Sequence, residues 1–373
     1  MGADGLVGLF CELVAVDSES MHEGEIAALV ESRLSQWGCK VRRDGAGRRI
    51  GSDAGNLYVR AGNSTGSHSL LLSAHLDTVK PGRGVVPRVG KRVIRSDGRR
   101  VLGADDKAGL AIAMGLLREA AEGKMGRCGL EAVFSVAEER GILGIKHANR
   151  GWLRSKRALV LDGSGRAASV IISSPTQYNL KLVFQGRKAH AGVEPEKGVS
   201  AIEAASRAIS RMRLGRIDPL TTANMGIIGG GTAVNIVPDR VEVMGEARSL
   251  DRKRLESQVR SMKEAAMDGA SSVGAAVSIE VRQAYEGYAL PADDPLVKLV
   301  VEAGESLGMH VETCSSGGGS DANQLNAWGI TAVVLNTGAF NPHSEKEYLD
   351  IREFGRAYGL CRRIIELHGA GGG

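Results

Sequence analysis

Histidine and carboxylate side chains follow several apolar runs of this 373-residue chain, at the points where each run ends. The run SLLLSA is followed by His75 and Asp77, and residues two positions apart in an extended chain point to the same side. Likewise, EAVFSVA is followed by Glu138 and Glu139, and RALVL by Asp162. Imidazole and carboxylate groups bind divalent metal ions and transfer protons. These residues therefore predict a chemical site, provided that the runs are neighbouring strands.

Two further segments carry groups of the same kind. The loop GADDK places Asp105 and Asp106 before a helical pattern, and TAVVLNTG leads on to His343 in GAFNPHSE. Taken singly, the acids of GADDK can cap a helix, Glu138-Glu139 and Asp162-Gly163 can be turns, and His343 can be structural. Separate turns give no reason for such groups to follow successive core strands. The joint pattern therefore favours one shared site.

Two imidazoles and three carboxylates are a suitable ligand set for a pair of zinc-like divalent ions. Such a pair activates water and polarises a carbonyl group, so the chemistry predicted is hydrolysis. A general base is also needed, as a carboxylate near the ions that does not bind them. Adjacent glutamates at a strand end should point to opposite sides, so that one of Glu138 and Glu139 can bind metal while the other faces the water.

Strands alternate with helices up to about residue 175, and a helix is also expected over 141–153. This alternation predicts the α/β class, with a mostly parallel sheet and helices on both faces. From about residue 175 the order becomes β-α-β-β-α-β, which is the ferredoxin-like α+β pattern. We therefore expect an α/β domain built from 1–174 and 289–373, interrupted by a smaller inserted domain over 175–288.

The composition excludes several other classes of protein. Hydrophobic residues make up 43% and charged residues 24%, which is typical of a globular protein, and the net charge of +5 is spread without long blocks, so no nucleic-acid partner is expected. Five scattered cysteines, never spaced as CxxC, indicate neither a disulfide framework nor a thiolate zinc site. The start of the chain does not resemble a secretory signal, and no stretch reaches eighteen apolar residues. We expect a cytoplasmic protein with no membrane partner.

Seven motifs carry a resemblance to a known family. HLDTV, LGADDKAG, AEERG, LDGSG, KAHAG, GGGSDANQLNAWGI and NPHSEKEYLDI together resemble the M20 family of metallopeptidases, most closely its tripeptidase T-like branch, over nearly the whole chain. The resemblance implies that two metal ions share Asp105, and that Asp106 caps the helix. It further implies metal ligands and neighbouring catalytic groups: His75 and Asp162 on the first ion, Glu139 and His343 on the second, Asp77 orienting the imidazole of His75, and Glu138 as the general base.

The same resemblance implies that 1–174 and 289–373 form the catalytic domain, and that the inserted domain over 175–288 is a lid and dimerisation domain with substrate-binding residues. His190 in KAHAG corresponds to a histidine that in dimeric relatives reaches the site of the neighbouring subunit and stabilises the oxyanion. Asn235 and Arg248 match substrate-binding positions, and an arginine can hold a carboxylate with two hydrogen bonds. Structural roles for His190 and Arg248 are the alternative. A homodimer formed through the lid domain is expected.

The sequence therefore predicts an enzyme that hydrolyses peptide bonds in short peptides, an aminopeptidase of tripeptidase type. The expected cofactors are two divalent ions per subunit, zinc or else cobalt or manganese. An N-acyl-amino-acid amidohydrolase or a carboxypeptidase on the same metal centre is an alternative, because LDGSG and AEERG depart from the commoner patterns of the branch and leave the substrate open. A peptide-binding scaffold without catalysis is the alternative from another class.

Overall fold

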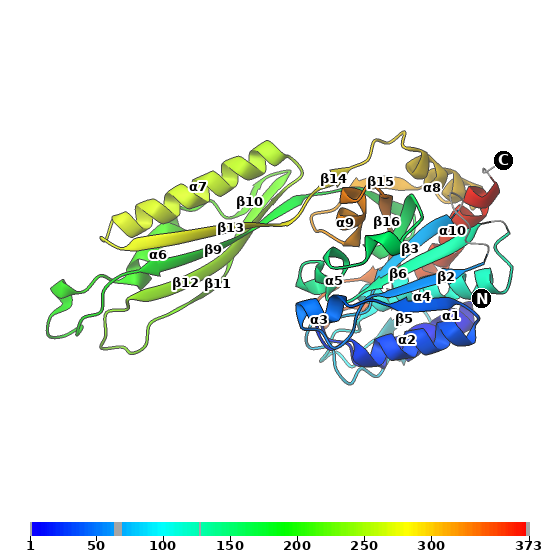
Figure 1. The fold of residues 1–373 in the computed structure, drawn as a ribbon, viewed down its shortest axis with the longest axis horizontal. Coiled ribbons are helices and arrows are strands. Elements are labelled where there is room, and N and C mark those ends of the chain that lie inside the picture. The colour runs from blue at the N-terminus through cyan, green and yellow to red at the C-terminus, as the bar shows by residue number, and fades with distance from the viewer. Residues whose placement is uncertain (1, 63–68, 127, 371–373) are drawn as a thin grey trace. The chain divides into compact units, whose positions relative to one another are not determined.

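The computed structural model describes residues 2–62, 69–126 and 128–370. The chain forms two compact units (Figure 1). The first, here called the α/β unit, is Met1–Ser173 with Ala289–Gly373, and the second, here called the insert unit, is Ser174–Tyr288. Of the helices in the described ranges, none has the length and apolar character needed to cross a lipid bilayer.

A large mixed sheet of twelve strands lies at the centre of the α/β unit, with a main path in the order β1-β2-β6-β3-β7-β16-β17-β5-β4. The four central strands run parallel to one another. The strands are β1 (Lys40–Arg43), β2 (Leu57–Ala61), β3 (Ser69–His75), β4 (Arg88–Val89), β5 (Val93–Arg95), β6 (Gly129–Ser135), β7 (Arg157–Ser164), β8 (Ser169–Ser174), β14 (Tyr288–Ala289), β15 (Glu312–Ser315), β16 (Thr331–Phe340) and β17 (Tyr348–Asp350).

Helices cover this sheet. Every residue of β3 and β6 is buried, so both faces of these strands are covered, as apolar runs such as SLLL and AVF require. The predicted α/β class with a mostly parallel central sheet is confirmed. The helices are α1 (Ala3–Val14), α2 (Gly24–Gln36), α3 (Ala46–Ile50), α4 (Ala104–Ala121), α5 (Leu143–Lys146), α8 (Pro295–Ser306), α9 (Asp321–Ala327) and α10 (Ile351–Ala370).

The helix predicted over 141–153 is wrong. Only the short α5 and a 3₁₀ turn at Arg150–Trp152 form there. Ile142 has a positive φ of 53°, and glycines weaken a helix. Gly144 has a packing role instead, because a Cβ at this position would lie 2.0 Å from the carbonyl oxygen of Val136.

The insert unit is a five-stranded antiparallel sheet in the order β10-β11-β12-β9-β13, with α6 and α7 on one face (Figure 1). Its elements are β9 (Thr176–Gln185), α6 (Ala201–Arg211), β10 (Gly215–Asp218), β11 (Thr221–Gly230), β12 (Arg240–Ser249), α7 (Arg252–Ser271) and β13 (Ala276–Tyr285). The predicted ferredoxin-like order is present, with the short β10 added. Alternate residues of β9, including Leu180, Leu182 and Phe184, are buried in the core of this unit.

Candidate metal centre

The parallel register of the central strands brings the first two predicted groups together. Ser73 of β3 pairs with Val160 of β7, so His75 and Asp162, two residues further along each strand, lie at the same level. Helix α4 approaches β7 closely at Gly109, where a Cβ would lie 1.9 Å from the carbonyl oxygen of Leu161. The glycine of the GADDKAG motif therefore allows the start of α4 to lie beside these strand ends.

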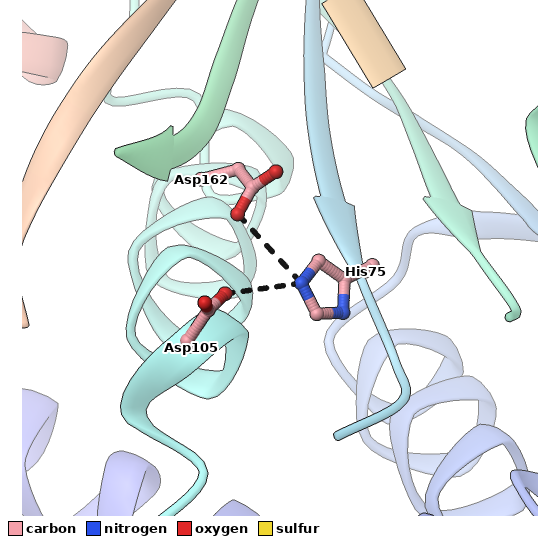
Figure 2. Close-up of side chains that lie close together, drawn as sticks. All are labelled: His75, Asp105 and Asp162. Atoms are coloured by element: carbon pink, nitrogen blue, oxygen red, sulfur yellow. Dashed lines mark hydrogen bonds and ion pairs between the residues drawn. The ribbon is translucent and has the colours of Figure 1, made fainter. Parts of the chain in front are cut away.

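His75, Asp105 and Asp162 form a first group of potential metal ligands (Figure 2). The Nε2 atom of His75 lies 3.1 Å from Oδ1 of Asp105 and 3.7 Å from Oδ1 of Asp162. One ligand atom from each residue lies within 4.8 Å of the others. These distances are short enough for a single ion to contact all three side chains.

Asp105, Glu139 and His343 form a second group of the same kind. The Nε2 atom of His343 lies 2.7 Å from Oε1 of Glu139 and 3.3 Å from Oδ2 of Asp105. Asp105 therefore directs one carboxylate oxygen toward each group. This shared position is the one that a carboxylate bridging two ions would occupy.

Glu138 lies beside both groups and forms a third with His75 and Glu139. The expectation that the two glutamates continue the strand is wrong, because β6 ends at Ser135 and Glu138–Arg140 is a 3₁₀ turn. Ala137 turns the chain with a φ of 49°. The placement of the two carboxylates is therefore set by this turn and not by the alternation of a strand.

Asp77 is fully buried and holds this turn and the imidazole at the same time. Its Oδ1 lies 3.3 Å from Nδ1 of His75 and accepts a hydrogen bond from the backbone N–H of Glu138 (2.9 Å). Its Oδ2 accepts hydrogen bonds from the backbone N–H of Glu139 (3.2 Å) and from the hydroxyl of Ser20 (2.7 Å). Because the His75 Nδ1 faces Asp77, the Nε2 is directed toward Asp105 and Asp162.

Two further acidic residues, Asp106 and Asp321, differ in whether they cap a helix. Asp106 caps the regular part of α4, which follows a kink at Asp105 and Asp106, because its Oδ1 accepts from the backbone N–H of Gly109 (3.1 Å). Asp321, in contrast, is the first residue of α9, and the N-cap of that helix is Ser320. Asp321 is buried, and its Oδ2 accepts hydrogen bonds from the hydroxyls of Ser135 (2.6 Å) and Ser73 (3.2 Å) on the central strands.

Buried charged groups near the centre include three that were not singled out from the sequence: Glu347, Glu23 and Lys107. Glu347 accepts from the backbone N–H groups of Gly103 and Asp105, and Glu23 from those of Met21 and Ala137. Lys107 donates to the hydroxyl of Ser18, and its charge interacts with the carboxylates of Asp77 and Glu347. Lys107 and Glu347 lie inside the motifs GADDK and NPHSEKEYLDI, which was the available signal, whereas nothing near Glu23 in the sequence indicates its role.

Crowding of carboxyl groups perturbs the acid–base behaviour of the centre. Burial and then the charge of Asp162 raise the pKa of Glu138 well above its ordinary value, and burial with the charge of Asp105 raises the pKa of Asp162 to about 7. Hydrogen bonds to Asp105 and Glu139 raise the pKa of His343 to about 10. A cation would relieve this excess of negative charge. The nitrogen and oxygen donors of the two groups therefore fit zinc-like divalent ions.

The remaining predicted residues lie in the insert unit. His190 and Asn235 are exposed on neighbouring segments, joined by the hydrogen bond from the N–H of Ala191 to the carbonyl oxygen of Asn235 (2.9 Å). Arg248 lies on β12, and its Nε and Nη2 each lie 2.8 Å from a carboxylate oxygen of Glu246. Its guanidinium group therefore already holds a carboxylate in the two-bond geometry expected for a substrate.

Comparison with known proteins extends over both units. A model described as a peptidase dimerisation domain matches residues 176–273, and the peptidase family M28 model matches 56–193. The chain is 38% identical to the Bacillus subtilis protein YqjE over 96% of each chain. It is 38% identical to the aminopeptidase PepT of Bacillus cereus (TM-score 0.87) and 34% identical to a tripeptidase of Staphylococcus aureus (TM-score 0.92), each over 99% of both chains.

These similarities cover the whole chain at levels of identity that define a family, and they agree with the order of motifs around the strand ends. The dimerisation-domain match falls within the insert unit. The chain therefore belongs to the M20 family of metallopeptidases, enzymes that hydrolyse peptide bonds, and to its branch of PepT-like tripeptidases.

Proposed function

We propose that this enzyme uses two divalent metal ions to hydrolyse peptide bonds in short peptides, as an aminopeptidase of tripeptidase type. The observation that carries the proposal is the pair of overlapping ligand groups that share Asp105, with the carboxylate of Glu138 beside them. The similarity to the PepT aminopeptidase and to the tripeptidase supports the choice of short peptides as substrate.

Five side chains would hold the ions. His75 and Asp162 would bind the first ion, Glu139 and His343 the second, and Asp105 both. When bound, two such ions lower the pKa of a water molecule and polarise the carbonyl group of the scissile bond. We propose zinc as the native metal, with cobalt or manganese as alternatives, because the donor set mixes imidazole nitrogen with carboxylate oxygen.

Glu138 would be the general base. Its carboxylate lies within 4.8 Å of ligand atoms of His75 and Glu139, which places it at the edge of the centre. A raised pKa suits a group that accepts a proton from water and then returns it to the leaving amine. Asp77 would not touch the substrate, since its oxygens are engaged with His75, Ser20 and the turn at Glu138.

The insert unit would supply substrate-binding groups. We propose that His190 stabilises the oxyanion, that Asn235 contacts the peptide backbone, and that Arg248 binds a substrate carboxylate. The ion pair of Arg248 with Glu246 would have to open or rearrange for this contact.

A homodimer that forms through the insert unit is the proposed assembly. Within the described residues, β10 pairs only with Thr221–Ala223 of β11, so Asn224–Gly230 form an open sheet edge. Ile227 and Ile228 on this edge are 59% and 56% exposed. An open apolar edge favours pairing with a second copy about a twofold axis. The cytoplasm is the proposed location, because the five cysteines are free and a reducing compartment keeps thiols in that state.

A hydrolysis panel tests the proposal. The enzyme is reconstituted with zinc, cobalt or manganese and offered a tripeptide with both ends free, the same tripeptide with an acetylated amine, the same with an amidated carboxyl end, and an N-acetyl amino acid. Cleavage that requires the free amine supports the aminopeptidase. Cleavage of only the acetylated substrates would instead identify an acyl-amino-acid amidohydrolase. A requirement for the free carboxyl end without one for the free amine would identify a carboxypeptidase. No cleavage of any substrate would favour the non-catalytic scaffold.

A further inference from the structure

Two of the proposed metal ligands lie on loops that are distant in the sequence. Asp105 is the second residue of α4 and has non-helical backbone angles, whereas His343 lies in the connection between β16 and β17. Their side chains meet at 3.3 Å, although no regular secondary structure joins the two loops in the described residues. Some other contact must therefore fix the distance between them.

The connection that carries His343 has an unusual backbone. Asn341 and His343 have positive φ angles of 55° and 59°, which residues other than glycine adopt only when their surroundings hold them there. At its ends, Phe340 of β16 pairs with Tyr348 of β17, and the two rings stack at 5.1 Å. The strands thus anchor the ends of the connection, but its centre needs a further contact.

Glu347 provides that contact. It follows His343 by four residues, and only 2% of its surface is exposed. Its Oε2 accepts a hydrogen bond from the backbone N–H of Gly103 (2.7 Å), and its Oε1 accepts one from the backbone N–H of Asp105 (2.9 Å). Its own N–H donates to the carbonyl oxygen of Ser344 (3.0 Å), which closes the turn after His343.

We propose that Glu347 is a positioning residue, which ties the His343 loop to the Asp105 loop so that both side chains present their ligand atoms to the second metal ion. Both of its oxygens are used by backbone N–H groups, and Glu347 belongs to none of the three ligand groups. It therefore acts through Asp105 and His343. This inference rests on the two-metal centre proposed above.

The test replaces Glu347 with glutamine, whose amide nitrogen cannot accept a hydrogen bond, so one of the two loop contacts is lost. Zinc is titrated into the metal-free full-length protein by calorimetry. We expect the Kd of the weaker of two sites to rise about 10- to 100-fold, the usual effect of losing a group that supports a metal ligand. The turnover number at saturating zinc should return to near the wild-type value, since Glu347 takes no part in the chemistry.

Glu131→Gln is the matched control. Glu131 is also 2% exposed and accepts hydrogen bonds from backbone N–H groups, those of Arg154 and Ser155, but it lies outside the ligand groups. Its replacement should lower thermal stability without changing zinc affinity. If Glu347→Gln does not fold, Glu347→Asp, which keeps the charge on a shorter stem, serves in its place and should show a smaller rise in Kd.

Unchanged zinc affinities in a folded Glu347 variant would overturn the inference while leaving the proposed function intact. A wild-type protein that binds two ions but cleaves no peptide would contradict the proposed function, and the calorimetric comparison would still decide the role of Glu347. A wild-type protein that binds fewer than two ions would overturn both.

Discussion

Replacing Asp77 with asparagine tests how the centre is held together. The change keeps the shape of the side chain, but it removes the negative charge and turns one accepting oxygen into a donor. The backbone N–H groups of Glu138 and Glu139 cannot reorient, whereas the hydroxyl of Ser20 can rotate to accept. The asparagine oxygen should therefore stay toward His75 and Glu138, which leaves the N–H of Glu139 without its acceptor.

The magnitude follows from this single lost bond. A hydrogen bond to a charged group contributes about 1.5–3 kcal/mol, and about 1.4 kcal/mol corresponds to tenfold in affinity. Asp77→Asn should thus weaken zinc binding about 10- to 100-fold, because Glu139 is held less firmly, whereas Nδ1 of His75 keeps its contact with the backbone oxygen of Asp77 (3.0 Å). His75→Ala should instead remove an ion, since it deletes a proposed ligand.

Calorimetric zinc titration and the kcat/KM for a tripeptide are the two measurements for this prediction. Asp44→Asn is the control, because Asp44 also accepts hydrogen bonds from backbone N–H groups, at Ala46 and Asn56, but lies outside the ligand groups. Unchanged zinc affinity and rate in Asp77→Asn would refute the reasoning. Loss of a whole ion, as in His75→Ala, would show that Asp77 is itself a ligand.

Three other perturbations have expected outcomes. Glu138→Gln should keep both metal ions, measured by elemental analysis, but lower kcat about 10²- to 10⁴-fold as expected for a lost general base; substantial remaining turnover would exclude that role. Burial raises the pKa of Asp321 from 3.8 to about 6, so the ionised carboxylate costs folding about 3 kcal/mol, fully above pH 6 and not at all below pH 3.8. Asp321→Asn should therefore raise the Tm relative to wild type at pH 8 more than at pH 4, and an equal difference at both would contradict this. Ile228→Lys on the open β11 edge should weaken a dimer at least about tenfold in analytical ultracentrifugation, whereas Leu307→Lys, at an exposed position of the α/β unit, should not.

The sequence was informative where chemistry follows strand ends. SLLLSAH predicts a buried strand that presents His75 at its end, and the parallel register then brings Asp162 beside it. Local patterns cannot show that register, but alternating strands and helices make a parallel sheet the expected arrangement. The same reasoning predicts the insert, whose two helices each bury one face against the sheet.

What could not be predicted depends on long-range hydrogen bonds. The turn at Ala137 forms because Asp77 accepts both N–H groups that follow, 61 and 62 residues away. Asp321 accepts hydrogen bonds from the hydroxyls of Ser73 and Ser135 on the central strands, which lie 248 and 186 residues away in the sequence. Pattern and propensity describe neighbours in the chain, so such contacts are visible only once the fold is known.

The rate of tripeptide hydrolysis as a function of zinc added to metal-free enzyme tests the central claim most directly. Two groups that share Asp105 predict a rate that is near zero without metal and reaches its plateau at two equivalents of zinc per chain. A rate that is independent of added metal, or no hydrolysis at any zinc concentration, would contradict a two-metal peptidase.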